Sequence, residues 1–182
     1  MVKGKGASGS GDSKVVPAEI ETLLKLLSQS PRRISAASKA LEDSRLYFRP
    51  DDKSWSANDV LAHLRACADV WGRSIMAMIA QDHPTLRYVS PRTWIRRTDY
   101  PDLEFRPSLD AFTRQRKELL KSLKTLGLEG WARGATFTAT TRGREETVLS
   151  CVQRMAMHEH KHCGQVESLL IGDAQDIRRD SR

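Results

Sequence analysis

The chain has 182 residues, 39% of them hydrophobic and 29% charged, which is typical of one soluble globular domain. It contains no run of eighteen or more apolar residues, so a membrane-spanning helix is not expected. The three cysteines (Cys67, Cys151 and Cys163) are odd in number and widely spaced, which argues against a disulfide framework and favours reduced thiols in a cytoplasmic protein.

The formal net charge of +7 would permit binding to nucleic acid or to another acidic surface. This surplus is scattered along the chain, and no block of about five or six like charges occurs. We therefore expect a solvated basic surface and do not expect a nucleic-acid partner.

The first long helix is expected after a polar start to the chain. Residues 1–16 are rich in Gly, Ser and Lys and lack an apolar segment, which predicts a flexible tail without a secretory signal. A helical pattern of apolar residues opens at Pro17, a favourable first helical residue, and continues to about Leu41. Pro31 interrupts this pattern and either starts a second segment or kinks the first. A loop is expected over residues 48–53, which contain Pro50 and two aspartates.

A second helix is predicted to start after Ser56 and to run to about Gln81. Ser56 is a good N-cap, and Asp59 stands where it suits both a capping box and the helix dipole. His63 flanks the apolar seam of this helix, and Cys67 lies one turn after His63. The seam, whose members are spaced by three and four, consists of Val60, Leu64, Cys67, Trp71, Ile75 and Met78.

Residues 82–107 show no regular pattern and contain four prolines. A loop of this length is usually functional or mobile, and its aromatic residues could either wall a pocket or cover one end of a bundle. Ser108 is then predicted to cap a third helix that ends near Leu126. The inner side of this helix is marked by Leu109, Phe112, Arg116, Leu119, Leu120 and Leu123.

The β-prone residues 134–141, bounded by two glycines, predict a short hairpin or extended excursion. Thr147 is predicted to cap the last helix, and residues 172–182 to form a charged tail. The seam of the last helix is Val148, Cys151, Val152, Met155, His158, His162, Val166 and Leu169. Four amphipathic helices predict an all-α fold, a four-helix bundle over residues 17–171 with a short extended or hairpin insert before the last helix.

Three of the five histidines lie close together in the last helix, at His158, His160 and His162. The i, i+4 spacing of His158 and His162 places both imidazoles on one helix face, where they can bind one divalent metal ion. His160 is displaced by about 200° around the helix and should point outward. The alternative is a polar helix end that is rich in histidine and binds no metal.

With Glu159, this run also has the His-Glu-x-x-His spacing of zinc peptidases, in which the glutamate is the general base. The extended form of that motif would need a glycine and a histidine where this chain has Gln165 and Ser168. A peptidase is therefore disfavoured, and a third ligand must come from upstream. His83 and His63 are the candidates, and His63 is favoured because it lies in mid-helix beside the apolar seam.

Two segments resemble motifs of the DinB-like family of small metal-binding four-helix bundles. Residues 55–64 read Trp-Ser-Ala-Asn-Asp-Val-Leu-Ala-His-Leu and are similar to the W-S-x-x-[DE]-V-L-x-H-L segment of that family. Residues 158–166 read His-Glu-His-Lys-His-Cys-Gly-Gln-Val and are similar to its H-E-x-x-H-x-G-Q-[ILV] segment in the last helix. The two motifs stand in the expected order and separation, and the resemblance spans residues 17–171. Cys163 stands where the family often has arginine or a similar side chain.

The resemblance implies that His63, His158 and His162 bind one divalent metal ion, most often zinc or nickel. Three neutral imidazoles leave at least one coordination position open, which is the pattern of a catalytic site. The resemblance also implies a metal-dependent enzyme acting on a small molecule, either a hydrolase or a transferase that uses a low-molecular-weight thiol. The alternative is a non-catalytic metal-binding module of a stress response. A homodimer through helix faces is a further expectation.

Three residues beside these ligands have open roles. Glu159, at the edge of the apolar stripe, is the candidate catalytic residue, but it could instead orient a ligand or face solvent. Asp59 could orient the imidazole of His63, although its capping role is favoured. Cys67 could approach the metal, although a buried structural thiol is favoured.

Overall fold

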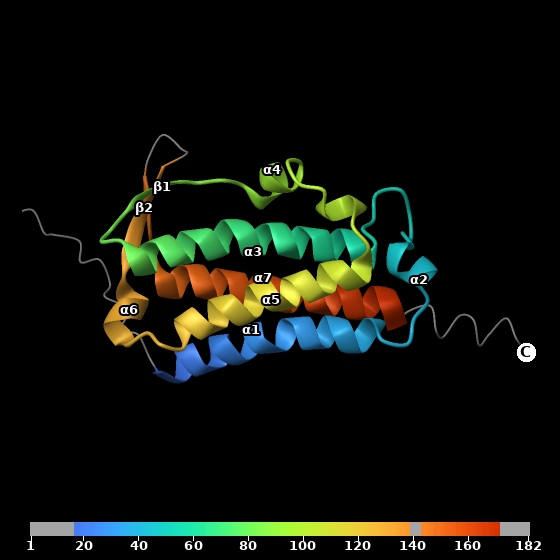
Figure 1. The fold of residues 1–182 in the computed structure, drawn as a ribbon, viewed down its shortest axis with the longest axis horizontal. Coiled ribbons are helices and arrows are strands. Elements are labelled where there is room, and N and C mark those ends of the chain that lie inside the picture. Colours follow the sequence, from blue (N-terminus) through green and yellow to red (C-terminus); the bar gives the residue numbers. More distant parts are fainter. Residues whose placement is uncertain (1–16, 139–142, 172–182) are drawn as a thin grey trace, which may run out of the picture.

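The computed structural model describes residues 17–138 and 143–171, in which four long helices form a bundle (Figure 1). Each of α1 and α3 packs against both α5 and α7, so α1 and α3 occupy opposite corners of the bundle. The predicted all-α four-helix bundle is therefore confirmed. None of the described helices is long and apolar enough to cross a membrane. The four long helices are α1 (Pro17–Ser38), α3 (Ala57–Ala80), α5 (Phe105–Leu123) and α7 (Val148–Ile171).

The connection between α3 and α5 crosses the length of the bundle, because these two helices run in the same direction (Figure 1). Along the outside of α3 it carries β1 (Thr85–Arg87), α4 (Pro91–Ile95) and the 3-10 helix η1 (Tyr100–Asp102), and both α4 and η1 pack against α3. The prediction of an irregular loop over residues 82–107 was therefore wrong in part. Elements of three to five residues are too short to show a hydrophobic period, so the sequence pattern does not reveal them.

Two helices have boundaries that differ from the prediction. α1 continues through Pro31 as one helix and is followed by the short helix α2 (Asp43–Tyr47). α5 begins at Phe105 and not after Ser108, so Pro107 lies in the first turn, where its missing N–H would have had no intrahelical partner. Ser108 is buried and accepts a hydrogen bond of 3.0 Å from the guanidinium of Arg65 on α3.

The predicted hairpin before the last helix is confirmed, as β2 (Gly134–Thr138) paired antiparallel with β3 (Arg144–Thr147). β2 also pairs with β1 in parallel, which gives a three-stranded sheet. The short helix α6 (Leu128–Ala132) directly precedes β2. Thr147 caps α7 as predicted, since its Oγ1 accepts a hydrogen bond of 3.1 Å from the amide of Ser150. The predicted tails, residues 1–16 and 172–182, lie outside the described residues.

The most buried stripe of α7 differs by a small rotation from the predicted seam. Glu159 and Cys163 are fully buried, Leu170 replaces Leu169 as the buried residue near the end, and His158 and His162 are half-buried on the flank. The two imidazoles therefore border the core instead of filling it. In this position both imidazoles face His63 of α3.

Candidate metal centre

His63 lies in the second turn of α3, and the residues that cap this helix act as predicted. Ser56 Oγ accepts from the Asp59 amide at 3.1 Å, and Asp59 accepts from the Ser56 amide at 2.9 Å, which completes a capping box. Arg49 also donates two hydrogen bonds of 2.8 Å to Asp59. Burial alone would raise the pKa of Asp59, but the hydrogen bonds from Arg49 and Ser56 outweigh it and hold that pKa below its ordinary value. The Asp59 carboxylate is thus engaged by Arg49 and Ser56 at the helix start, and its hydrogen bonds in the described part of the chain do not include the imidazole of His63.

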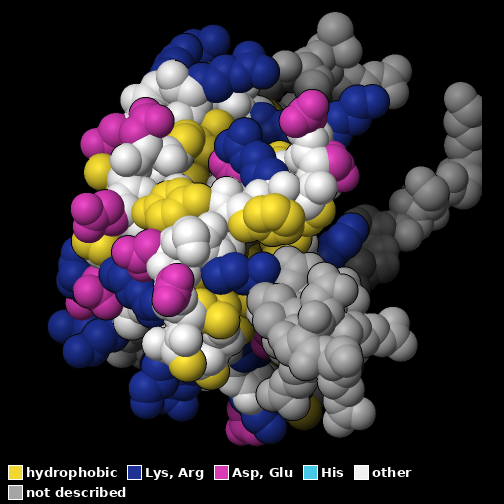
Figure 2. All heavy atoms as spheres, turned by 90° about the vertical axis from the view of Figure 1, so that its right-hand side faces the viewer, with side chains coloured by type: hydrophobic (Ala, Val, Ile, Leu, Met, Phe, Trp, Pro, Cys, Tyr) yellow, Lys and Arg dark blue, Asp and Glu magenta, His cyan; other side chains and the backbone are white. Residues whose placement is uncertain are grey.

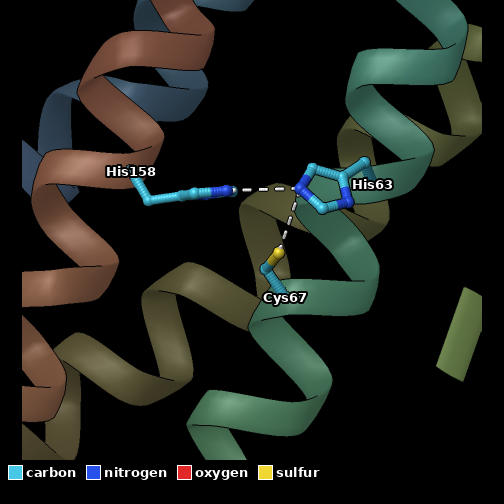
Figure 3. Close-up of side chains that lie close together, drawn as sticks. All are labelled: His63, Cys67 and His158. Atoms are coloured by element: carbon cyan, nitrogen blue, oxygen red, sulfur yellow. Dashed lines mark hydrogen bonds between the residues drawn. The ribbon is translucent and has the colours of Figure 1, made fainter. Parts of the chain in front are cut away.

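The structure brings His63 of α3 together with His158 and His162 of α7. His63 Nε2 lies 3.2 Å from His158 Nε2, and Figure 3 shows the two rings pointing toward each other from facing helices. The ring centroid of His162 is 4.4 Å from that of His158 and 5.1 Å from that of His63. One histidine from α3 and two from α7 therefore lie side by side, although the two helices place them about a hundred positions apart in the chain.

His162 has neighbours that hold its ring in place. Its Nδ1 lies 2.8 Å from Oε1 of Gln165, one turn further along α7. A carbonyl oxygen can only accept, so Nδ1 carries the proton and Nε2 keeps the lone pair that a metal ion would need. The indole of Trp55 stacks against the same ring, with centroids 6.1 Å apart and planes inclined by 12°. Gln165 and Trp55 thus select a tautomer and an orientation suited to metal binding.

The thiol of Cys67 lies beside the imidazole of His63, within the distance expected of two ligands of one metal ion. Its Sγ is 3.5 Å from His63 Nε2, and donor atoms of His63, Cys67 and His158 all lie within 4.8 Å of one another (Figure 3). Tetrahedral zinc, with Zn–N near 2.05 Å and Zn–S near 2.3 Å, would set two nitrogens about 3.3 Å apart and a nitrogen and a sulfur about 3.6 Å apart. The observed separations of 3.2 Å and 3.5 Å match these values. The donor atoms of His63, Cys67 and His158 therefore fit a divalent cation, and among the described residues His162 is not part of this group, although its ring is adjacent to both imidazoles.

Burial keeps the three imidazoles neutral. Desolvation, with a smaller effect from the neighbouring His162, lowers the pKa of His63 and of His158 to about 4. Desolvation also lowers the pKa of His162. Neutral imidazoles offer lone pairs to a metal ion at neutral pH without first losing a proton. Burial raises the pKa of the Cys67 thiol far above its ordinary value, so this group is protonated unless a cation lies beside it.

Glu159, the candidate catalytic residue, is buried inside the bundle and lies neither at the edge of the apolar stripe of α7 nor toward solvent. Its side chain is 0% exposed and forms an ion pair with Arg116 of α5, whose side chain is 2% exposed. Arg116 Nη1 also lies 3.1 Å from Met155 Sδ. Burial raises the pKa of Glu159, and the guanidinium of Arg116 opposes that rise. Desolvation of a carboxylate is costly without a partner, so the α5 cation explains why Glu159 turns inward.

The two remaining histidines lie elsewhere. His160 is exposed, as predicted, and its Nδ1 lies 3.0 Å from Nη1 of Arg33 on α1. His83 follows α3 and lies 3.0 Å from the Glu145 carboxylate on β3. Of the two upstream candidates for a third ligand, only His63 is near His158.

A pocket of about 470 Å³ opens beside His63. It lies between the start of α3 and the crossing segment, and this volume is in the range of small-molecule sites. The residues that line it are Trp55, Asp59, Ala62, His63, Arg92, Ile95, Arg96 and Pro101.

The aromatic residues of the crossing segment hold it against α3. Asp69 of α3 accepts hydrogen bonds from Trp94 Nε1 at 3.0 Å and from the Tyr100 hydroxyl at 2.7 Å. Gln115 of α5 donates a third, at 2.6 Å. The aromatic side chains Trp94 and Tyr100 therefore position the pocket wall, while Ile95 and Pro101 line it.

Several residues of this region were not foreseen as functional. Arg116 lies on the predicted inner side of its helix. A cation among apolar residues in this position indicates a buried anionic partner. Gln165 stood inside the quoted motif, but its contact with His162 needs the helix geometry to be seen. Asp69 and Arg92 carried no signal, because their roles depend on how the crossing segment lies on α3.

Comparisons with known proteins identify the family of the chain and support its fold. A family model described as the DinB superfamily matches residues 26–166. No curated protein matches the chain. Among solved structures, YfiT from Bacillus subtilis, described as a probable metal-dependent hydrolase with an unusual four-helix bundle topology, matches with a TM-score of 0.74 and 17% identity over 88% of this chain and 91% of its own. At that identity the likeness concerns the fold, whereas the family model covers most of the sequence. The chain belongs to the DinB superfamily.

Proposed function

We propose that the protein binds one divalent metal ion, zinc or nickel, through His63, His158 and His162, and that it is a metal-dependent enzyme acting on a small molecule. The observation that carries this proposal is the meeting of three neutral, half-buried or buried imidazoles from α3 and α7 beside a pocket of about 470 Å³. Hydrolysis is the preferred reaction, and the description of YfiT as a probable metal-dependent hydrolase supports that choice.

A divalent ion held by neutral imidazoles lowers the pKa of water or of a thiol and polarises a carbonyl group. The protein's own part is to supply the lone pairs and to orient them: Gln165 sets the tautomer of His162, and Trp55 fixes its ring. Glu159 does not serve as a general base in this proposal, because it is buried in its pair with Arg116. The same site could take a low-molecular-weight thiol as co-substrate, which is the alternative reaction.

The metal site is tested by metal analysis of the purified protein and of single variants. We expect about one equivalent of divalent metal in the wild type and a large loss in His63→Ala, His158→Ala and His162→Ala. His160→Ala is the matched control, since this exposed histidine lies in the same helix and contacts Arg33 instead. Full occupancy in His158→Ala, or equal loss in His160→Ala, would show that the ligand set is wrong.

The reaction is tested on the metal-loaded protein with small ester, amide and thiol-transfer substrates. Hydrolysis that disappears with His158→Ala and survives in His160→Ala supports the preferred reaction. Turnover that requires an added low-molecular-weight thiol supports the transferase alternative. No turnover with any of these substrate classes would contradict both reactions and leave the metal site to be explained by a non-catalytic role.

The second candidate function is a non-catalytic metal-binding module, and the position of Cys67 favours it. If its thiolate joined the three imidazoles, four protein ligands would fill a tetrahedral site and close it to substrate. Cobalt substitution distinguishes the two cases, because a cobalt–thiolate bond gives an intense near-ultraviolet charge-transfer band that imidazole ligands do not. A band that disappears in Cys67→Ser supports the closed site, whereas a cobalt spectrum unchanged by Cys67→Ser supports the open one.

A further inference from the structure

Two arginines of the crossing segment line the same pocket as His63. Arg92 and Arg96 are spaced i, i+4 at α4, so their side chains lie on one side of this short helix. Both are exposed at the pocket, and the charge of Arg92 is close enough to His63 to disfavour the imidazolium form. Positive charge is therefore concentrated on one wall of the proposed reaction site.

These two guanidinium groups differ from the other arginines around this face, which have partners within the fold. Arg49 is paired with Asp59, and Arg65 lies 3.8 Å above the ring of Tyr100. Arg73 lies 4.5 Å above the ring of Trp94. Within residues 17–138 and 143–171, neither Arg92 nor Arg96 has a hydrogen-bonding, ionic or aromatic side-chain partner.

The pocket contains one carboxylate among its described lining residues, and that carboxylate does not neutralise the arginines. Asp59 is held by Arg49 and by the capping box at the start of α3. The pocket thus keeps an uncompensated positive charge of two from Arg92 and Arg96. Arginine is well suited to carboxylate and phosphate groups because its planar donors can form paired hydrogen bonds.

The other walls of the pocket are apolar. Trp55, Ala62, Ile95 and Pro101 supply them, next to the polar wall formed by the arginines. A ligand that satisfies both surfaces has an apolar body and an anionic group.

We propose that this pocket selects a small organic anion, whose carboxylate or phosphate group is bound by Arg92 and Arg96 while its apolar body packs against Trp55 and Ile95. The assignment of this anion as the substrate rests on the proposed metal-dependent function. Anion binding itself rests on the arginines and needs no metal, so the two proposals can fail separately.

The test is a ligand-observed NMR titration of the full chain with benzoate, phenyl phosphate and the uncharged benzamide, each with zinc-loaded and with metal-free protein. We expect at least one of the two anions to bind the metal-free wild type, and the tighter of them to identify the anionic group. Loss of a charge-assisted contact predicts that Arg92→Ala and Arg96→Ala each weaken this binding by roughly tenfold. Benzamide should bind much more weakly, and anion binding should fall with added salt.

Arg97→Ala is the matched control, because Arg97 is an exposed neighbour of Arg96 that does not line the pocket. It should bind the anion within about twofold of the wild type, and thermal melts should show that all three variants fold. The proposal is overturned if neither anion binds, if benzamide binds as well as benzoate, or if Arg97→Ala weakens binding as much as Arg96→Ala. If the wild type binds an anion but takes up no zinc when zinc is supplied, this proposal remains intact and the metal-dependent function is contradicted.

Discussion

The buried ion pair between Arg116 and Glu159 makes a strong prediction about stability. Both side chains are almost completely removed from solvent, at 2% and 0% exposure. Glu159→Gln keeps the shape of the side chain but removes its charge, and Arg116→Met keeps most of the apolar stem and removes the cation. Each single change leaves one charged group buried without its partner.

The expected cost of either single variant is about 3–5 kcal/mol in the free energy of unfolding, because the remaining charge keeps its desolvation penalty and loses its compensation. For a domain of this size, 1 kcal/mol changes Tm by about 2–4 °C, so Tm should fall by roughly 6–20 °C. The double variant Arg116→Met/Glu159→Leu removes both charges. It should be close to the wild type in stability, since an apolar replacement of a buried pair is often neutral or stabilising.

The assay is thermal and urea unfolding of the wild type, the two single variants and the double variant, with metal content measured on the same samples. Metal content should remain near that of the wild type in Glu159→Gln, because its carboxylate is paired with Arg116 and not with the imidazoles. Unchanged stability in both single variants would refute the reasoning about the pair. Unchanged stability in Glu159→Gln together with loss of catalysis would instead restore Glu159 as a catalytic residue.

Three further predictions concern the metal centre and the start of α3. Gln165→Leu removes the hydrogen-bond partner of His162 and should weaken metal affinity by about 10–100-fold without changing the fold. Competition with a chromogenic chelator measures this affinity, and an unchanged value would exclude His162 as a ligand oriented by Gln165. Zinc at about 100 times its Kd should stabilise metal-free wild-type protein by about 2.7 kcal/mol in thermal melts and should not stabilise His158→Ala. An equal rise in Tm for both proteins would show that zinc binds elsewhere. Folding lowers the pKa of Asp59 below its ordinary value of 3.8. Its carboxylate therefore contributes fully to folding stability above pH 3.8, and this contribution is lost as the pH falls through the lower pKa of the folded state. Asp59→Asn should therefore be less stable than the wild type at neutral pH by urea unfolding, with a difference that shrinks in strong acid; a constant difference across pH would exclude the carboxylate charge as its cause.

The local features of the chain were predictable because their causes are local. The capping box of Ser56 and Asp59 depends on residues three positions apart, and the hairpin before α7 depends on β-prone residues between glycines. The spacing of His158 and His162 likewise places both on one helix face. Each of these needs only the period of a helix or strand, which the order of residues specifies.

The predicted position of Glu159 at the edge of the apolar stripe was wrong, because a helical wheel has no information about neighbouring helices. By its angular position the side chain belonged to the edge of α7, yet Arg116 of α5 stabilises it inside the bundle. The crossing segment was missed for a related reason. Its short elements are held by contacts with α3, notably those of Trp94 and Tyr100 with Asp69, and not by a pattern of their own.

Figure 2 shows one end of the bundle, where basic and acidic side chains are interspersed with apolar patches. On that face the surplus of positive charge is not gathered into one basic surface. This distribution agrees with the solvated surface expected from the scattered charges in the sequence. The functional positive charge that we propose is instead the pair Arg92 and Arg96 at the pocket.

The amino-acid sequence by itself determined four amphipathic helices, the caps of α3 and α7, the hairpin insert and the i, i+4 histidines, because hydrophobic period and turn chemistry act over a few residues. Only the tertiary structure decided that His63 lies 3.2 Å from His158, that Cys67 joins them, and that Arg92 and Arg96 share their pocket. These contacts link residues far apart in the chain. They exist because α3 and α7 pack together and because the parallel course of α3 and α5 sends the connection back across the bundle.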